Sequence, residues 1–252
     1  MNKWYGKVAV VTGASSGIGA ETCRQLTSRG MTVVGFARRI DKLEALRNEL
    51  HGLPGKFYPV KVDVCSEESI LEGFAWAKTT LKSVDVLVNN AGVCLTGELL
   101  GNSDEWKVMF DTNVLGPSIC SREAVKIMQE LKTIGHIINI NSDSGHYPPT
   151  LTPNLYVYGA TKFSSVSITE SLRELLALKK LPIRVTSISP GLVDTAMAKD
   201  LAENAPILKP SDVVDAIIYV LAAPQSVNVA EVIIRPTGDT YLPFVQDGLK
   251  FI

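Results

Sequence analysis

The sequence predicts a single α/β domain in which a parallel β-sheet is covered by helices on both faces. Short apolar segments alternate with segments of helical periodicity along the whole 252-residue chain. The apolar segments are continuously hydrophobic, which is typical of strands that are buried on both faces. No linker, repeat or low-complexity tract divides the sequence. These observations together favour a doubly wound sheet.

Seven short apolar segments are expected to form the strands. Each has a length typical of a buried strand, and several end in polar or glycine-containing turns. They lie at residues 7–12, 32–37, 56–62, 84–88, 136–141, 183–187 and 232–235.

Apolar periodicity and capping residues predict the helices between these strands. Leu43, Leu46 and Leu50 share one helical face in segment 41–50, for example. Asp41, Ser66 and Ser211 can each cap a helix that begins at that point. The expected helices cover residues 17–29, 41–50, 66–81, a segment from about 105, 117–131, 158–178 and 211–222. The long proline-containing connections 143–157 and 189–210 are candidate active-site loops.

Composition excludes several functional classes. The formal net charge is −1, from 25 basic and 26 acidic residues, which gives no support for nucleic-acid binding. No apolar run approaches the roughly 20 residues of a membrane span, and no signal peptide is evident, so we expect a cytoplasmic protein. The cysteines Cys23, Cys65, Cys94 and Cys120 form no CxxC pair. We therefore expect no metal site, and we expect buried free thiols.

The segment TGASSGIG follows the first expected strand and opens the first helix. Gly13 permits a tight turn, Gly17 lets the backbone approach a pyrophosphate, and Gly19 allows close contact between helix and strand. The helix N-terminus would offer free N–H groups, and Ser15 and Ser16 could add hydroxyl donors. The spacing G-x-x-x-G-x-G has one more residue in its first gap than the standard fingerprint. Its position between strand and helix nevertheless favours a dinucleotide site over a structural turn.

The end of the second strand indicates which dinucleotide is bound. An NAD-selective site would place an acidic residue there, whereas this chain has Arg38 and Arg39 and no acid before Asp41. A guanidinium pairs well with a phosphate, so NADP is favoured over NAD unless both arginines are merely solvated. Asp63, after the third strand, is expected beside the adenine ring, as the cap of the next helix, or in both roles.

Six motifs in order resemble the short-chain dehydrogenase/reductase superfamily. They are TGASSGIG, NNAG at 89–92, Asn113, Ser142, YGATK at 158–162 and SPG at 189–191, and they span most of the chain. The resemblance implies a seven-stranded Rossmann sheet, hydride transfer to or from the nicotinamide of NAD(P), and homodimers or homotetramers. It also implies one domain, 1–252, with a cofactor half of about 1–140 and a catalytic half of about 141–252.

The same resemblance implies a role for each catalytic residue. Tyr158 matches the catalytic acid/base and Lys162 its partner, Ser142 the residue that holds the substrate oxygen, and Asn113 the residue that organises a proton-relay water. Tyr158 and Lys162 are four residues apart, so they share one face of a helix. An ammonium beside a phenol favours the phenolate, so we expect a lowered pKa for Tyr158.

Two of these assignments have neighbours of the same residue type. Tyr156 is excluded as the acid/base because the residue four positions on is an alanine, and we expect it in the loop before the helix. Family members commonly read SSxxG where this chain reads NSDSG. Counting back from Gly145 favours Ser142 as the catalytic serine, and Ser144 is the alternative.

The turns after the strands supply the remaining expected cofactor contacts. The backbone near Val193 is expected at the nicotinamide, with the Thr195 hydroxyl near its carboxamide. His146 is assigned no catalytic role. The further expected contacts are Ile18, Val64, Asn89, Ala91, Gly92, Pro190 and Gly191, in addition to the residues already described and to Tyr158 and Lys162.

Two stretches narrow the resemblance. HIININSDSGH and LKPSDVVDAIIYVLAAP resemble farnesol-dehydrogenase-like and dehydrogenase/reductase member 11-like enzymes, which use NADP(H) with lipophilic alcohols and carbonyls such as isoprenoids and ketosteroids. Segment 193–208 is expected to form a helical lid in which Met197, Leu201 and Leu208 either face the substrate or simply pack. A non-catalytic NADP(H) sensor usually loses the tyrosine or the lysine. Lyases and epimerases with the same pair are usually longer.

Overall fold

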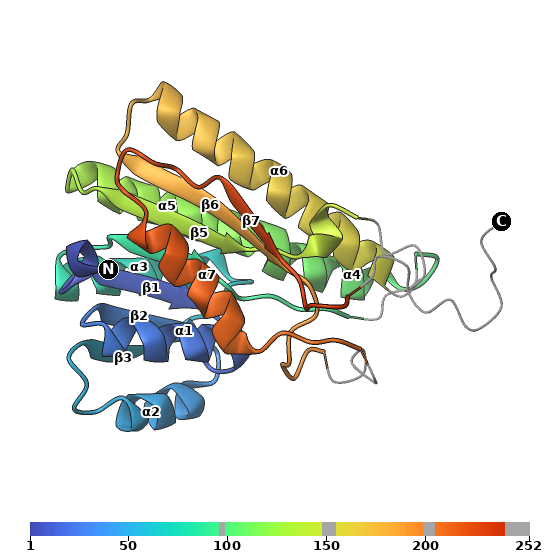
Figure 1. The fold of residues 1–252 in the computed structure, drawn as a ribbon, viewed down its shortest axis with the longest axis horizontal. Helices are drawn as coiled ribbons and strands as arrows, with labels where there is room; N and C mark the ends of the chain where they lie inside the picture. Colours follow the sequence, from blue (N-terminus) through green and yellow to red (C-terminus); the bar gives the residue numbers. More distant parts are fainter. Residues whose placement is uncertain (96–98, 148–154, 199–204, 240–252) are drawn as a thin grey trace.

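Seven parallel strands form one sheet in the order β3-β2-β1-β4-β5-β6-β7 (Figure 1). This computed structural model describes residues 1–95, 99–147, 155–198 and 205–239. The order reverses on either side of β1, which pairs with β2 on one side and with β4 on the other. The strands are β1 (Val8–Thr12), β2 (Thr32–Ala37), β3 (Lys56–Lys61), β4 (Val86–Asn89), β5 (Gly135–Ile140), β6 (Ile183–Pro190) and β7 (Glu231–Ile234).

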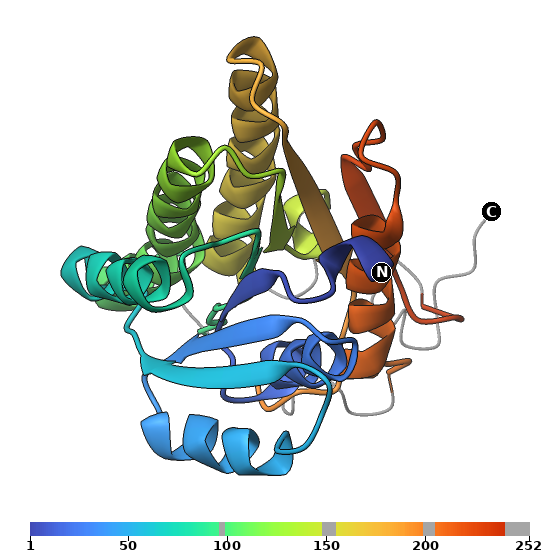
Figure 2. The same ribbon diagram turned by 90° about the vertical axis from the view of Figure 1, so that its left-hand side faces the viewer.

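Helices cover both faces of this sheet, as the second view in Figure 2 shows. One face carries α1 (Gly17–Ser28), α2 (Ile40–Glu49) and α7 (Pro210–Ala222). The other carries α3 (Glu67–Leu81), α5 (Gly116–Glu130) and α6 (Tyr156–Leu178), and α4 (Ser103–Phe110) packs against α6. A π-helical turn, Asp111–Leu115, joins α4 to α5, and short 3₁₀ helices lie at Asn2–Trp4 and Asp143–Gly145. Within the described part of the chain, no helix is both long and apolar enough to cross a bilayer.

Alternate side chains of the central strands enter different cores. In β1, Ala9 and Val11 pack with α1, α2 and α7, whereas Val8 and Val10 pack with α3, α5 and α6. Side chains alternate between the faces of a strand, so a strand buried on both faces is apolar on both sides, as β1 is from Val8 to Val11. The predicted doubly wound α/β fold is therefore confirmed.

Several predicted element boundaries are wrong by a few residues. Helix α6 begins at Tyr156, so this tyrosine lies in the first turn and not in the preceding loop. No side chain caps α6, so the sequence contains no capping residue that would indicate where this helix begins. Helix α7 begins at Pro210, where the backbone N–H of Lys209 donates to the Asp212 carboxylate at 2.8 Å, so Ser211 is not its cap. Asp41 likewise lies in the first turn of α2.

The prediction that all four cysteines are free thiols is correct. The prediction that they are buried holds for two of the four. All four cysteines are free, and Cys23 and Cys120 are buried in helices α1 and α5. Cys65 is exposed and Cys94 is half-buried, because both lie in connections that leave the carboxyl edge of the sheet.

A buried carboxylate joins β1 to β4 at the amino edge of the sheet. Asp85 is 1% exposed and immediately precedes β4. It accepts hydrogen bonds from the backbone N–H of Val8 at 2.8 Å and from the Ser83 hydroxyl at 3.0 Å. The Lys7 ammonium lies 3.6 Å from its other oxygen.

We predict that Asp85→Ala lowers Tm by about 3 to 10 °C. The Val8 N–H would remain buried without an acceptor, which costs about 1–3 kcal/mol, and each kcal/mol shifts Tm by about 2–4 °C in a chain of this size. Thermal unfolding followed by circular dichroism measures the change. Asp104→Ala, which breaks an exposed pair with Lys107, is the control and should leave Tm within about 1 °C. An Asp85→Ala protein as stable as wild type would contradict this role.

Candidate active site

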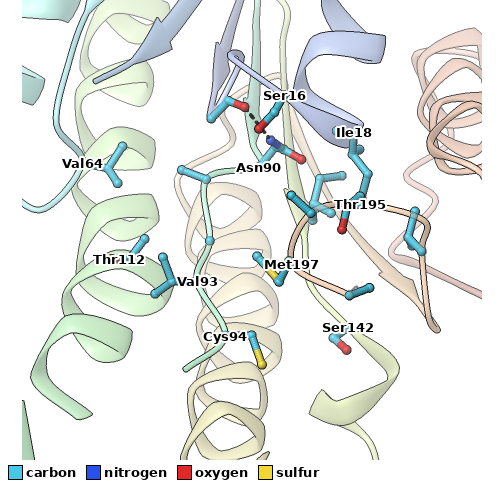
Figure 3. A pocket seen from close by; sticks show the side chains of 18 of the residues that line it. Ser16, Ile18, Val64, Asn90, Val93, Cys94, Thr112, Ser142, Thr195 and Met197 are labelled. Atoms are coloured by element: carbon cyan, nitrogen blue, oxygen red, sulfur yellow. Dashed lines mark hydrogen bonds between the residues drawn. The ribbon is translucent and has the colours of Figure 1, made fainter. Parts of the chain in front are cut away.

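A cavity of about 510 Å³ opens along the carboxyl edge of the sheet. The segments that follow six strands, β1 to β6, contribute to its wall. This is where a doubly wound sheet binds ligands, beside the point at which the strand order reverses. Figure 3 shows Ser16 and Asn90 at one end of the cavity, and Cys94 and Ser142 toward the other.

The glycine-rich loop folds as the spacing predicts. Gly13 and Gly17 have φ angles of +66° and +53°, a region that favours glycine. A Cβ atom on Gly19 would lie 2.4 Å from the carbonyl oxygen of Gly13, so α1 can approach the loop only because this residue is a glycine. Gly13 and Gly17 line the cavity, whereas Gly19 contributes to packing and does not line it.

The glycine-rich loop, called the phosphate loop below, is joined by hydrogen bonds to the turn that follows β4. The Thr12 hydroxyl accepts hydrogen bonds from the backbone N–H groups of Asn90 and Ala91, both at 3.0 Å. The Asn90 amide donates to the carbonyl of Thr12 at 3.0 Å. Asn90 lines the cavity, although it is not among the expected cofactor contacts.

Asn89 takes a different position from the one predicted. Its side chain is 3% exposed and donates to the Ser121 hydroxyl at 2.9 Å and to the amide oxygen of Asn139 at 2.8 Å. It does not line the large cavity. Strand alternation could have separated the two asparagines, because successive side chains at the end of β4 point to opposite sides.

Arg39 lies over the phosphate loop. Its guanidinium donates to the Ser15 hydroxyl at 2.8 Å and to the Ser16 hydroxyl at 2.9 Å. Arg38 also lines the cavity and is exposed. Asp63 lines the cavity and accepts a hydrogen bond from the backbone N–H of Cys65 at 3.0 Å, but it does not cap the next helix, because the N-cap of α3 is Ser66.

Tyr158, Lys162 and Ser142 meet at the opposite end of the cavity. Tyr158 and Lys162 lie one turn apart on α6, with the ammonium 5.6 Å from the centre of the phenol ring. The Lys162 side chain is buried and donates to the carbonyl of Ile140 at 3.2 Å. Ser142 follows β5 and lines the same end of the cavity as Tyr158. Ser144, the alternative serine, lines the same cavity and donates its backbone N–H to the Ser142 hydroxyl at 3.1 Å.

Burial controls the ionisation of both groups on α6. It lowers the pKa of Lys162 to about 8, although the Cys94 thiolate form would favour the ammonium. It raises the pKa of Tyr158 above its usual value, and the charges of Cys94 and Asp143 add to that increase, while the Ser142 hydrogen bond opposes it. The expectation that the pKa of Tyr158 is lowered is therefore wrong for the protein's own groups, because loss of hydration outweighs the favourable contacts.

Asn113 connects two other elements and does not line the large cavity. Its amide oxygen accepts from the backbone N–H of Val93 at 2.9 Å, and its amide nitrogen donates to the Val93 carbonyl at 2.9 Å and to the Thr161 hydroxyl at 3.0 Å. It lies in the π-helical turn, where its carbonyl accepts from the Ser165 hydroxyl at 2.9 Å.

A second cavity of about 20 Å³ lies beside Asn113. Lys162, Asn89 and Asn141 also line it. The amide oxygen of Asn89 is buried there without a hydrogen-bond partner. A cavity of this size and polarity suits a single water molecule. Lys162 lines both cavities.

The large cavity brings together most of the predicted site residues. The exceptions are Asn113, Gly19 and Asn89. The others that line it are Gly13, Ser15, Ser16, Gly17, Ile18, Arg38, Arg39, Asp63, Val64, Ala91, Gly92, Ser142, Tyr158, Lys162, Pro190, Gly191, Val193 and Thr195.

Several lining residues were missed because they carry no motif of their own. Val93, Cys94 and Thr112 lie between the motifs, and a side-chain type alone does not place them. The same holds for Ile140, Asn141, Asp143, Leu155, Leu192, Ala196 and Ala198, whereas Met197 was expected either to face the substrate or to pack.

The described ends of segment 193–208 contain no helix. Met197 lines the cavity, whereas Leu208 packs against the core and pairs with Val193 in a β-bridge. Leu201 lies outside the described residues, as do Pro148, Pro149 and Pro153 of the other long connection. His146 does not line the large cavity, and its Nε2 contacts the Glu231 carboxylate at 2.8 Å.

The sequence and the fold match those of known enzymes. Residues 7–206 match the short chain dehydrogenase family, so the chain belongs to that family of oxidoreductases. It is 44% identical to dehydrogenase/reductase SDR family member 11 of Gallus gallus over 94% of this chain and 98% of the relative. It is 41% identical to farnesol dehydrogenase of Aedes aegypti over 96% and 100%.

Solved structures of oxidoreductases have the same fold as this chain. A closed form of serine dehydrogenase complexed with NADP⁺ has a TM-score of 0.85 and 31% identity, covering 97% of this chain and 99% of that one. A metagenomic short-chain oxidoreductase in complex with NADP has a TM-score of 0.80 and 30% identity, covering 92% and 98%.

The buried ammonium of Lys162 makes a testable contribution to stability. Between about pH 8 and the ordinary lysine pKa of 10.5, the unfolded chain binds a proton that the folded chain has released. Stability therefore rises with pH across this window, and the full cost, about 3 kcal/mol, applies below it.

We predict that Lys162→Met removes this pH dependence. The Tm of the variant relative to wild type should be highest near neutral pH and should fall by several degrees as pH rises from about 8 to about 10.5. Thermal unfolding across that range measures the difference. Lys179→Met, which removes an exposed ammonium at the end of α6, is the control. If the difference between Lys162→Met and wild type stays constant with pH, Lys162 is not held in an environment that disfavours its charge.

Proposed function

We propose that the protein is an NADP(H)-dependent oxidoreductase that transfers a hydride between the nicotinamide and a lipophilic alcohol or carbonyl. The observation that carries the proposal is one continuous cavity with Arg39 and the glycine-rich loop at one end and Tyr158, Lys162 and Ser142 at the other. In this proposal the chain up to about residue 140 mainly binds cofactor, and the chain from 141 on supplies the catalytic groups.

The residues at the phosphate end fit a dinucleotide that carries a 2′-phosphate. The positive φ angles of Gly13 and Gly17 open the backbone, and the N-terminus of α1 attracts the pyrophosphate. Arg39 lies where it can pair with a 2′-phosphate, together with the hydroxyl of Ser15 and with Arg38. The bound cofactor would supply or accept the hydride.

The protein's own groups handle the proton. A buried, protonated Tyr158 is suited to donate to the oxygen of a carbonyl that is being reduced. The Ser142 hydroxyl would hold that oxygen in place. Lys162, with a pKa of about 8, can pass a proton toward the second cavity, where a water held near Asn113 would complete the relay.

Apolar side chains near the catalytic groups support a lipophilic substrate. Val93, Leu155, Leu192 and Met197 line the cavity. The relatives named dehydrogenase/reductase SDR family member 11 and farnesol dehydrogenase support the same class, which includes isoprenoid alcohols, ketosteroids and other ketones or aldehydes. A homodimer or homotetramer in the cytoplasm belongs to the same proposal and rests on the family resemblance.

A non-catalytic NADP(H)-binding protein is the second candidate. It would need the phosphate end of the cavity and would not need the proton-handling groups. The convergence of Tyr158, Lys162 and Ser142 at one end favours catalysis.

We predict that the protein oxidises NADPH with members of a panel of lipophilic ketones and aldehydes, and that Tyr158→Phe lowers kcat by about 10²- to 10⁴-fold. Loss of a general acid has this magnitude. The loss of NADPH absorbance measures the rate. Tyr156→Phe is the matched control, because Tyr156 is the first residue of the same helix. This variant should retain most of the activity. Turnover that survives in Tyr158→Phe would contradict the assignment, and the absence of any turnover would favour the binding protein.

We predict that Arg39→Ala raises KM for NADPH by about tenfold or more while changing KM for NADH by less than about threefold. The removed guanidinium would pair with a phosphate that NADH lacks. Arg38→Ala should act in the same direction. Steady-state kinetics with both cofactors measures the difference, with Arg24→Ala as control because Arg24 pairs with Glu49 outside the cavity. Equal effects on the two cofactors would contradict the preference for NADP.

A further inference from the structure

A carboxylate lies beside the residues that would react. Asp143 follows Ser142 in the 3₁₀ helix after β5 and lines the same cavity. The Ser142 hydroxyl donates to its Oδ1 at 3.3 Å. The proposed proton transfer uses Tyr158, Lys162 and Ser142 and gives Asp143 no part.

Asp143 belongs to a cluster in which two carboxylates share one guanidinium. Arg235 Nε lies 3.5 Å from Asp143 Oδ2 and 2.7 Å from Asp239 Oδ2. A Cβ atom on Gly191, which lines the cavity, would lie 3.5 Å from the Asp143 oxygen and 3.6 Å from the Asp239 oxygen. Both carboxylates therefore adjoin the cavity wall at Gly191, and Asp143 also forms part of that wall.

Asp143 also has an electrostatic effect on Tyr158. Its carboxylate is one of the causes that raise the pKa of Tyr158. Burial raises the pKa of Asp143 itself, whereas Arg235 and the Ser142 hydroxyl favour its ionised form. Two positive charges lie nearby: Arg235, which contacts both Asp143 and Asp239, and Lys162, which lies 5.6 Å from the centre of the Tyr158 ring and donates to the carbonyl of Ile140.

We propose that Asp143 determines the charge of the substrate, so that the site accepts neutral alcohols and carbonyls and rejects those with a carboxylate next to the reacting carbon. This inference rests on the proposed function. A substrate whose oxygen contacts the Ser142 hydroxyl would bring the substituent on its reacting carbon near Asp143, because Asp143 Oδ1 lies 3.3 Å from that hydroxyl and Asp143 lines the cavity. A carboxylate on that substituent would be repelled by Asp143 in this partly buried site. A neutral ester or alkyl group meets no such repulsion.

A matched pair of ketones tests the proposal. Methyl phenylglyoxylate and phenylglyoxylate share one skeleton and differ in the charge next to the ketone. Wild-type enzyme should bind the ester at least about tenfold more tightly than the acid, as measured by calorimetry on the enzyme–NADP⁺ complex. Asp143→Asn should reduce this preference by about tenfold or more, mainly through tighter binding of the acid. The ratio of kcat/KM values for reduction should change in the same direction.

The controls separate this inference from the proposed function. Glu231→Gln removes an equal charge from the His146 contact outside the cavity and should leave the preference within about twofold. Unchanged ester binding in Asp143→Asn shows that the variant is folded. A wild type that binds the acid as well as the ester, or a preference that Asp143→Asn leaves intact, would overturn the role of Asp143. Since binding is measured directly, this result is independent of whether hydride transfer occurs.

Discussion

The hydrogen bonds between Thr12 and Asn90 join the ends of β1 and β4, and the active site depends on this junction. It fixes the phosphate loop against the turn that continues to Val93. Asn113 then pairs with Val93 on both its N–H and its carbonyl, and donates to Thr161 on α6. The Thr161 hydroxyl donates to the carbonyl of Tyr158 at 2.7 Å. A continuous set of polar contacts therefore relates the phosphate end of the cavity to the catalytic helix.

Burial of the catalytic pair is the second constraint. The site holds Lys162 where its charge is disfavoured and Tyr158 where its phenolate is disfavoured. Such an arrangement lowers stability and keeps two proton-carrying groups near each other with pKa values that have moved in opposite directions. Lys162 lines both the large cavity and the small cavity beside Asn113. Asp143 lies in the wall of the large cavity, next to Ser142.

The sequence predicted the sheet and most of the cavity wall because these depend on local signals. Continuous apolar runs identify strands buried on both faces, and glycines with positive φ identify the phosphate loop. The motif NNAG alone did not separate Asn89, which bonds to Ser121 and Asn139, from Asn90, which lines the cavity; the alternation of side chains at the end of β4 does so. It also placed Asn113 in the relay without revealing that its side chain joins Val93 to α6, which depends on contacts between residues 20 and 48 positions apart. The raised pKa of Tyr158 depends on tertiary burial.

Deuterium transfer tests the central claim, that the cavity brings a nicotinamide hydride to a carbonyl beside Tyr158. NADPH labelled with deuterium at C4 of the nicotinamide, on one face at a time, is incubated with a ketone substrate, and the product alcohol is analysed by mass spectrometry. The structure predicts one deuterium on the carbinol carbon from one labelled face and none from the other, because a single cavity wall fixes the orientation of the cofactor. An alcohol without label from either face, or with label from both, would contradict it.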